Sequence, residues 1–192
     1  MQEKKPIKKD EWAIVLDFLS HGHHTMDRSQ PVAHVIGEKY FSLLEVIVRE
    51  GVSLKIEDRV YIGDDKRKEV KYIRGKIGLN ELTTAGRGEL PSIVEKIVHK
   101  NAQQFIDFFN NSGNITTRMH RLELLPGIGK KHLWAIIGER KKKPFESFED
   151  IKKRVSLLPD PEKIVVKRII EELEEKDRYR IFVPKFEKAR RF

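Results

Sequence analysis

Hydrophobic positions in the N-terminal part of the chain occur in short runs rich in β-branched and aromatic residues, with polar residues and glycines between them. Runs of this length and composition are typical of β-strands. We therefore predict strands over residues 12–19, 33–36, 40–48, 59–63 and 70–74. Asp64, Asp65 and Lys66 separate the last two runs, so they predict a hairpin turn between two neighbouring strands.

Four or five short strands at this spacing favour a small closed β-barrel of the oligonucleotide-binding (OB) type, although a two-layer sheet would give much the same pattern. Tyr40, Phe41, Tyr61 and Tyr72 lie in these runs. Barrels of the OB type stack bases on aromatic rings, so these four residues are candidates for base stacking. The alternative for each of them is a place in the core of the barrel.

After Gly88 the hydrophobic residues change to the spacing of amphipathic helices. The residues that predict the first helix are Leu90, Ile93, Val94, Ile97, Val98, Phe105, Ile106 and Phe109. Polar residues and a glycine at 110–113 end this helix. Asn114 is then expected to cap a second helix that carries Ile115, Met119 and Leu122.

Capping residues indicate three further helices in the C-terminal part. The third helix follows Gly129. Ser147 and Asp150 resemble a capping box that opens the fourth. Asp160 and Pro161 supply the N-cap and the first-turn proline of the fifth.

The most informative stretch is 121–140, because it contains Leu-Pro-Gly-Ile-Gly-Lys-Lys at 125–131. It resembles the helix-hairpin-helix motif, in which a Pro-Gly-apolar-Gly turn followed by a basic residue joins two amphipathic helices. Gly127 and Gly129 would permit the positive φ angles and the close approach of a tight reversal, and Ile128 would pack against both helices. Beyond Gly129 the next helix presents unpaired N–H groups and a positive dipole end, which favour a phosphate oxygen.

Proteins with this motif bind one phosphate of a DNA or RNA backbone with little regard for sequence, and the resemblance implies the same contact here. The alternative is a hairpin that only packs helices or docks a protein partner. The residues that we predict to bind nucleic acid are Gly127, Ile128, Gly129, Lys130, Lys131 and His132, with Arg118, Arg121, Arg140, Lys141, Lys142 and Lys143 around them.

A second, altered copy of the hairpin follows, since residues 121–126 align with 154–159 and Lys130 then aligns with Lys163. Asp160 and Glu162 replace the two glycines, so we expect this copy to repel a phosphate and to be structural. A chance similarity between two amphipathic helices is the alternative.

These patterns predict an α+β chain with two domains. The first is an OB-like β-barrel domain at 1–87, and a connecting helix at 88–113 follows it. The second is a paired helix-hairpin-helix domain at 114–177. Residues 178–192 form a basic tail or, as the alternative, an added strand.

Charge supports a polyanionic partner, because the net charge of the chain is +9. Between Arg118 and Lys143 there are eight basic side chains and two acidic ones. Lysines and arginines that meet phosphates release condensed counterions, although a solvated surface with many ion pairs would have the same composition. The absence of cysteine excludes disulfides and cysteine-based metal sites, and no run is long and apolar enough to cross a membrane. We therefore expect a cytoplasmic protein.

Other kinds of site have little support. His21, His23, His24 and Asp27 have metal-ligand chemistry, but they lie in one glycine-containing loop without a rigid frame, so we expect no metal and no cofactor. Lys131 occupies the position of the catalytic lysine in helix-hairpin-helix DNA glycosylases, yet the aspartate-bearing stretch that should follow is missing. Phosphate-loop, nucleophile-elbow and zincin motifs are also missing, so we predict no catalytic residues.

Residues 115–131 and 141–151 carry a wider resemblance. Nearly the whole chain is similar to a family of archaeal proteins that contain a domain of unknown function and are usually called predicted RNA-binding proteins. This resemblance implies archaeal cytoplasm, an OB-like barrel and a helix-hairpin-helix domain. We therefore predict a non-enzymatic nucleic-acid-binding protein, and the resemblance favours RNA over DNA. The alternatives are a protein-interaction scaffold in a translation or DNA-repair complex and, third, a glycosylase-like enzyme.

Overall fold

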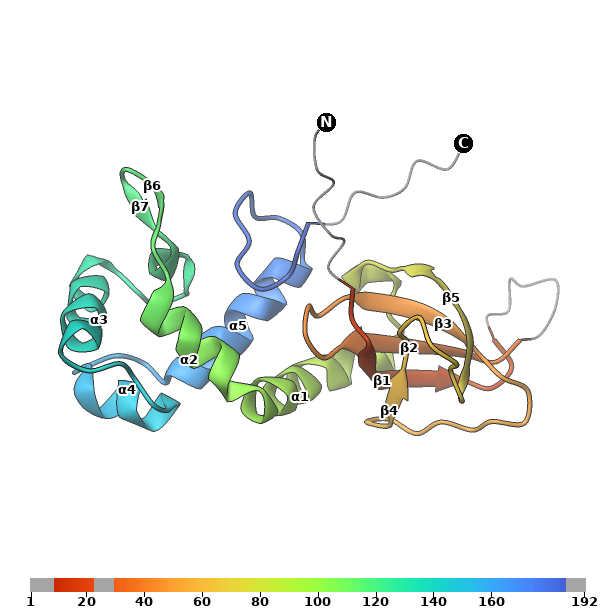
Figure 1. Ribbon diagram of the computed structural model, residues 1–192. Helices are drawn as coiled ribbons and strands as arrows, with labels where there is room; N and C mark the ends of the chain where they lie inside the picture. Colours follow the sequence, from red (N-terminus) through yellow and green to blue (C-terminus); the bar gives the residue numbers. More distant parts are fainter. Residues whose placement is uncertain (1–8, 23–29, 186–192) are drawn as a thin grey trace, which may run out of the picture. The chain divides into compact units, whose positions relative to one another are not determined.

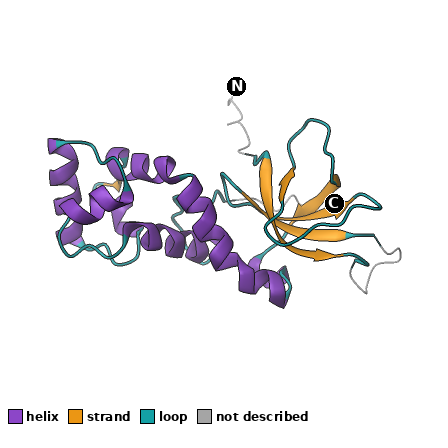
Figure 2. Cartoon of the chain, turned by 90° about the horizontal axis from the view of Figure 1, so that it is seen from below, coloured by secondary structure: helices purple, strands orange, loops and turns teal. Residues whose placement is uncertain are grey.

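The structure, a computed structural model, describes residues 9–22 and 30–185. Two compact units make up the chain (Figure 1). The first unit comprises the residues up to Ile93 together with the segment that begins at Phe182, and the second runs from Val94 to Ile181. The first holds a curled sheet and the second is mainly helical (Figure 2), so the α+β class predicted from the sequence is confirmed.

Five strands form the sheet of the first unit, and each overlaps one of the predicted runs, although β2 and β5 extend beyond theirs. Phe41 has a φ of +54°, which interrupts extended backbone, so the third strand begins at Leu43 and not at residue 40. The strands are β1 (Trp12–Leu19), β2 (Val32–Gly37), β3 (Leu43–Val48), β4 (Arg59–Tyr61) and β5 (Val70–Lys76). Their β-branched and aromatic residues fit a pleated, half-buried surface.

The strand order is β4-β1-β2-β3-β5, and every pair is antiparallel (Figure 1). The hairpin predicted between β4 and β5 is therefore wrong, since these two strands are the opposite edges of the sheet. Arg67 Nε does donate to the Gly63 carbonyl oxygen at 2.8 Å, so the chain bends where the turn residues lie. Local turn chemistry bends the backbone but does not choose the partner strand, which for β4 is β1 and for β5 is β3.

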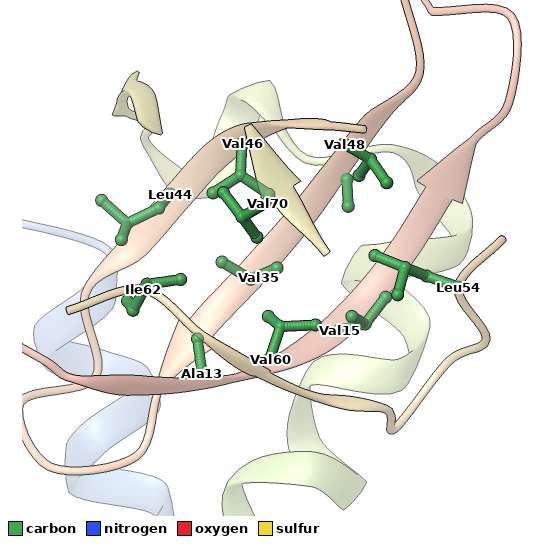
Figure 3. Close-up of a cluster of buried hydrophobic side chains, with 11 residues drawn as sticks. Ala13, Val15, Val35, Leu44, Val46, Val48, Leu54, Val60, Ile62 and Val70 are labelled. Atoms are coloured by element: carbon green, nitrogen blue, oxygen red, sulfur yellow. The ribbon is translucent and has the colours of Figure 1, made fainter. Parts of the chain in front are cut away.

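Small apolar side chains fill one face of the sheet (Figure 3). They alternate along β1, β2 and β3 because successive residues of a strand point to opposite faces. Residues from both edge strands join the same cluster, so the sheet curls into a half-barrel around it. The buried cluster consists of Ala13, Val15, Ala33, Val35, Leu44, Val46, Val48, Leu54, Val60, Ile62 and Val70.

After β5 the chain passes through a 3-10 helix, η1 (Leu79–Glu81), into the helix α1 (Thr84–Lys100). Thr83 fixes the start of α1, because its hydroxyl donates to Asp17 Oδ2 at 2.6 Å and accepts from the Gly86 N–H at 3.0 Å. The two units divide between residues 93 and 94, inside α1. Sequence analysis placed the end of the barrel domain at residue 87.

The single connecting helix predicted over 88–113 is wrong. The chain forms α1 and then α2 (Ala102–Asn111), with a break at Asn101, whose φ of −106° and ψ of 31° depart from helical values. Asparagine competes with helical backbone bonds through its side chain, which explains a break at this residue. The hydrophobic spacing continues on both sides of Asn101, so periodicity alone does not reveal the break.

The helix predicted to begin at Asn114 is also wrong, since a small hairpin and a 3-10 helix occupy this segment. Three consecutive β-branched residues, at 115–117, favour extended backbone here. The Arg118 N–H donates to Thr116 Oγ1 at 3.3 Å across the hairpin turn. The elements are β6 (Asn114–Thr116), β7 (Met119–His120) and η2 (Arg121–Leu124).

The remaining helices begin at the predicted capping residues. They are α3 (Lys130–Lys142), α4 (Phe148–Arg154) and α5 (Pro161–Leu173). Ser147 Oγ accepts from the Asp150 N–H at 3.0 Å, and Asp160 Oδ1 accepts from the N–H groups of Glu162 and Lys163 at 3.1 and 3.3 Å. None of the described helices is both long and apolar enough to span a bilayer.

One apolar side of each helix of the second unit is buried, as the amphipathic spacing predicts. Four phenylalanine and leucine residues from α2, η2 and α3 are at most 2% exposed: Phe105, Phe109, Leu122 and Leu133. The buried apolar residues of the helices α2 to α5 and η2 are Phe105, Ile106, Phe109, Leu122, Leu133, Ile136, Phe148, Ile151, Ile164, Val165, Ile169 and Leu173.

A buried ion pair holds the segment that follows α5. Arg168 Nε donates to Glu172 Oε1 at 2.8 Å, and its other nitrogens reach Asp177 Oδ2 and the Tyr179 carbonyl oxygen, each at 2.6 Å. Glu172 also accepts from the Ile181 N–H at 2.7 Å. Removal of one partner of such a pair costs about 3–5 kcal/mol. The first residues of the predicted basic tail are therefore bound to α5, whereas residues 186–192 lie outside the described residues.

Candidate nucleic-acid interface

Two buried side chains, Leu125 and Ile128, anchor the predicted turn before α3. The Leu125 N–H donates to the Leu122 carbonyl oxygen and the Ile128 N–H to that of Leu125, both at 3.1 Å. Gly127, between them, has a φ of +83°, which side chains rarely permit. The prediction of a positive φ at Gly127 and of a packing role for Ile128 is confirmed.

Gly129 differs from the prediction. Its φ of −94° and ψ of −177° are extended backbone, which any residue can adopt, so a positive φ is not the reason for a glycine here. Among the described residues, no heavy atom lies within 4 Å of the place where its Cβ would be. Gly129 is the N-cap of α3, and it has no side chain to accept from the first amides. The glycine leaves the space in front of these amides open.

The first turn of α3 contains backbone N–H groups that no intrahelical hydrogen bond uses. The first hydrogen bond that closes this helix runs from the Leu133 N–H to the Gly129 carbonyl oxygen, at 2.9 Å. The N–H groups of Lys130, Lys131 and His132 precede it and so have no intrahelical carbonyl partner. Together with the positive end of the helix dipole, these groups favour an anion in front of Gly129.

Lys130 forms an ion pair with a carboxylate of the preceding element, η2. Its ammonium group lies 2.7 Å from Glu123 Oε1, while Glu123 Oε2 accepts from the His120 N–H at 2.8 Å. These bonds, the one from Lys130 above all, hold the pKa of Glu123 below its usual value. Burial, with Arg140 nearby, lowers the pKa of His120, whose Nδ1 accepts from the Leu122 N–H at 3.1 Å. Glu123 therefore links η2 to α3 and partly neutralises Lys130.

Lys131, like Lys130, is exposed, and no ion pair of its ammonium group occurs within the described part of the chain. His132, beside it, is half-buried. Its Nδ1 lies 3.2 Å from the Gly127 carbonyl oxygen and its Nε2 lies 3.1 Å from that of Leu157. Because both ring nitrogens face backbone carbonyl groups, His132 joins the turns of the two hairpins and is not directed at a ligand.

The three predicted arginines occupy different places. Arg118 is exposed in the turn between β6 and β7, and Arg121 is exposed at the start of η2. Arg140 is half-buried, and its Nη1 donates to the Phe109 carbonyl oxygen at 2.9 Å. Burial lowers the pKa of this guanidinium. Arg140 thus holds α3 to the end of α2, and its side chain is already engaged there.

The lysines at the C-terminal end of α3 lie away from the first turn. Ten residues separate Lys131 from Lys141, which corresponds to about 15 Å along a helix. Lys142 pairs with Glu139 at 2.6 Å, and Lys143 pairs with Glu146 at 2.9 Å. Lys141 is exposed. The structure therefore brings together residues 127–132 and leaves 141–143 as a second basic group, where positive charge also complements the helix dipole.

The second hairpin is formed by α4, the following loop and α5, and the first turn of α5 is closed to an anion. The Asp160 carboxylate occupies the N-cap and accepts from two first-turn amides. Asp160 therefore corresponds to the N-cap Gly129, whereas the sequence alignment set it against Gly127. The first amides of α5 are therefore occupied by a side chain of the chain itself, whereas the sequence predicted repulsion of a phosphate by Asp160 and Glu162.

Arg154 supports the first hairpin, a role that sequence analysis missed. Its Nη2 donates to the carbonyl oxygens of Glu139 and Lys143, each at 2.6 Å, at the C-terminal end of α3. Its guanidinium lies over the Phe145 ring, 4.5 Å from the ring centroid. A lone arginine in a basic sequence carries no local signal for such a contact with residues more than ten positions away.

The aromatic residues of the first unit divide into core and surface. Phe41 is 1% exposed, so its ring has no face open to a base and its role is packing. Tyr72 is 43% exposed on β5, whereas Tyr40 and Tyr61 are half-buried. Sequence analysis missed Trp12, which packs edge-to-face on Tyr61 at 5.1 Å between ring centroids and carries the Arg59 guanidinium 3.9 Å above its ring.

Two exposed apolar residues near the first hairpin were also missed. Trp134 in α3 is 65% exposed, and Leu157 in the loop of the second hairpin is 78% exposed. The helical projection of α3 contained the signal for Trp134, because Leu133, Ile136 and Ile137 define the buried side and position 134 lies away from it. No local pattern could have indicated Leu157.

The described residues contain no group of three or more histidine, cysteine, aspartate or glutamate residues that could hold a metal ion. Of the histidine loop considered above, His21 and Gly22 are described, while His23, His24 and Asp27 lie outside the described residues.

Comparison with known proteins gives consistent matches over most of the chain. The model of a family described as "Protein of unknown function (DUF655)" matches residues 9–184. The chain is 40% identical over 184 residues to "Uncharacterized protein MJ0038" of Methanocaldococcus jannaschii, a match that covers 95% of this chain and 83% of the relative. The crystal structure of Af1531 from Archaeoglobus fulgidus, also attributed to DUF655, is 47% identical and covers 91% of this chain and 100% of that one, with a TM-score of 0.83.

Proposed function

We propose a function for this chain on the premise that it belongs to the DUF655 family, which has members in archaea. We infer that it is a nucleic-acid-binding protein without a catalytic step, and that it binds RNA in preference to DNA. In this proposal the turn at 127–129 and the first turn of α3 bind a backbone phosphate without strong sequence specificity.

The open N-terminus of α3 is the observation that supports this proposal. The three free amides directly follow a turn with two glycines. Gly127 provides the positive φ, and Gly129 leaves the space at its Cβ position open. Two lysines, Lys130 and Lys131, follow directly. A phosphate oxygen in this place would accept from the amides and be neutralised by the lysines. The comparison with α5 sharpens the inference, because its equivalent amides are already capped by Asp160.

Such a contact recognises the charge of the phosphate and does not distinguish one base from another. Phosphate contacts position a protein on a strand, while sequence is read from base edges. The amides and lysines of α3 have no feature that selects one base. The preference for RNA rests on the resemblance of the family, so it is tested directly by competition between RNA and DNA strands of the same sequence.

We propose in addition that the two units are an OB-type barrel and a paired helix-hairpin-helix domain. The curled sheet with the order β4-β1-β2-β3-β5 supports the first, and the two turns that meet at His132 support the second. The first helix of the first hairpin is reduced to η2, which is a departure from the usual motif. The exposed ring of Tyr72 on the sheet would provide a stacking surface in the first unit.

The sharpest test is Gly129→Asp. The extended backbone and the empty space at this position accept a side chain, and the new carboxylate would cap α3 as Asp160 caps α5. An N-cap of this kind stabilises a helix by about 0.5–2 kcal/mol relative to an uncapped one, and relative to glycine by a few tenths. We expect an equal or higher unfolding temperature together with a loss of binding of at least tenfold, measured by fluorescence anisotropy with a labelled oligoribonucleotide. Wild-type affinity in this variant would contradict the phosphate contact.

A second test uses Lys131→Gln with Lys163→Gln as the matched control, because Lys163 is an exposed lysine in the capped first turn of α5. Phosphate binding predicts a slope of about −3 or steeper in a plot of log affinity against log salt concentration. We expect Lys131→Gln to reduce this slope by about one and Lys163→Gln to leave it unchanged. Equal effects of the two variants would show a diffuse basic surface and not a site.

The rival functions make different predictions in the same assays. A protein-interaction scaffold would bind no nucleic acid with a salt-dependent slope of this size. A glycosylase-like enzyme would use the Lys131 amine as a nucleophile and form an imine with an abasic-site duplex, which borohydride would trap as a stable adduct. An adduct that disappears in Lys131→Gln would replace the non-enzymatic proposal.

A further inference from the structure

The solvent-facing side of α3 carries a large aromatic residue. Trp134 is 65% exposed, whereas Leu133 and Ile136 on the other side of the helix are buried. At 3.6 residues per turn, Lys130, Lys131, Gly138 and Lys141 lie on the same side as Trp134. All four are exposed. The indole is therefore the centre of a surface with lysines before and after it.

Gly138 lies one turn after Trp134, and packing does not explain it. A glycine inside a helix is unfavourable relative to alanine because its backbone loses more freedom on folding. A Cβ at Gly138 would meet no heavy atom within 4 Å among the described residues. A long side chain such as leucine would fit the helix, and because helical side chains point toward the N-terminus it would extend toward the indole from its C-terminal side. The glycine thus keeps one side of Trp134 accessible.

The lysines around Trp134 are spread over a length that fits an extended nucleic-acid strand and not a single small anion. From Lys130 to Lys141 the helix rises about 16 Å. Of these lysines, Lys130 is partly neutralised by Glu123, and Lys131 and Lys141 are exposed without an ion pair in the described part of the chain. Cations on both sides of an exposed ring match a chain of alternating phosphates and bases. An apolar protein surface would offer no negative charge to these lysines.

From this arrangement we propose that Trp134 stacks on an unpaired base of the strand whose phosphate lies at the first turn of α3. This inference rests on the proposed function and specifies its ligand as a single-stranded or looped segment. Bases inside a duplex already have both faces stacked, so they cannot cover the indole, whereas an unpaired base can. The phosphate on the far side of that base would then lie toward Lys141.

The test uses Trp12→Phe as the background, because the chain has two tryptophans and Trp134 then becomes the sole indole fluorophore. Three ligands of equal length are titrated: a single-stranded oligoribonucleotide, the same strand in a blunt duplex, and an abasic ribose-phosphate strand. We expect quenching of the indole by the first ligand only, although all three bind through their phosphates. Equal quenching by the abasic strand, or none by the single strand, would overturn the proposal.

Affinity measurements then test the energy of the contact. In Trp134→Ala we expect about a tenfold weaker binding of the single strand, which is within the range for one stacked base, and no change for the abasic strand. Trp134→Phe is expected to retain most of the affinity. The slope against salt is expected to stay constant, because the number of phosphates bound does not change.

Gly138→Leu separates accessibility from stability, and Gly88→Leu is its control, since Gly88 is also an exposed helical glycine with open space around it. We expect both variants to raise the unfolding temperature and only Gly138→Leu to weaken single-strand binding. If single strands bind with the expected salt slope and depend on Lys131, but Trp134 variants bind normally, the stacking inference alone is wrong. If no nucleic acid binds at all, the proposed function fails with it.

Discussion

Leu157 occupies a backbone conformation that its side chain disfavours. Its φ is +61°, in the left-handed region, and its side chain is 78% exposed. Only its carbonyl oxygen, which faces His132 Nε2 at 3.1 Å, takes part in joining the two hairpins. The left-handed conformation costs a non-glycine residue about 1–2 kcal/mol, and asparagine tolerates it better than leucine.

Leu157→Asn is therefore expected to stabilise the protein by about 0.5–1 kcal/mol, since the exposed leucine gives up little burial. The midpoint of urea unfolding measures this change. Leu158→Asn is the control, because Leu158 is buried next to it and its replacement is expected to be destabilising. A loss of stability in Leu157→Asn would mean that the leucine makes apolar contacts that its exposure conceals.

The two glycines of the turn show what residue identity can predict. Their presence in a Pro-Gly-Ile-Gly sequence was enough to predict a turn and a helix start. It was not enough to distinguish their roles, because a glycine serves equally for a positive φ, as at Gly127, and for empty space, as at Gly129. Only the dihedral angles and the surroundings of each glycine separate these requirements.

At the scale of elements, the sequence predicted best where one signal dominated. The run at 12–19 became β1 with the predicted bounds, and Ser147 and Asp160 cap the helices that they were expected to cap. The helix predicted at 114–124 was wrong because the β-branched residues of this segment favour extended backbone more strongly than its hydrophobic spacing favours a helix. Strand pairing failed at β4 and β5 because partners far apart in the chain are decided by the core that they share.

Glu123 joins two of these elements, and its charge makes the joint depend on pH. The lowered pKa of Glu123 means that the folded state favours its carboxylate. The stability that it contributes is therefore present above its ordinary pKa of 4.5 and is lost as the pH falls through the lowered value. Lys130 is largely exposed, so solvent screening limits the ion pair to about 0.5–1 kcal/mol.

Glu123→Gln is expected to be destabilised by this amount at pH 7, and its difference from the wild type is expected to shrink as the pH falls below 4.5, as measured by urea unfolding at several pH values. The same variant frees Lys130, so we expect it to bind single strands more tightly than the wild type. Glu149→Gln, which removes an equal charge from an exposed position of α4, is the control for net charge. A stability difference that does not decrease as the pH falls would show that the glutamate acts through packing and not through its charge.

At the scale of the whole molecule, each unit offers its own candidate surface. The first unit has the exposed ring of Tyr72 on its sheet, and the second has the open first turn of α3 with Trp134 beyond it. The net charge of +9 attracts a polyanion to both. Because one chain carries the two surfaces, a strand long enough to reach both would be bound with a gain from effective concentration, and a short strand would not.

Strand length therefore tests whether the units act together. Tyr72→Ala removes an exposed ring from β5, and Tyr72→Phe keeps the ring while removing its 3.3 Å hydrogen bond to Gln30. We expect Tyr72→Ala, but not Tyr72→Phe, to weaken binding of strands of about 20 nucleotides several-fold, because one stacked base contributes about 1–3 kcal/mol at most. For strands of about four nucleotides, the lower limit for one OB-type surface, quenching of Trp134 should be unaffected by either variant. Loss of short-strand quenching in Tyr72→Ala would mean that Tyr72 and Trp134 contact the same few nucleotides. Unchanged binding at every length would mean that α3 alone binds the strand.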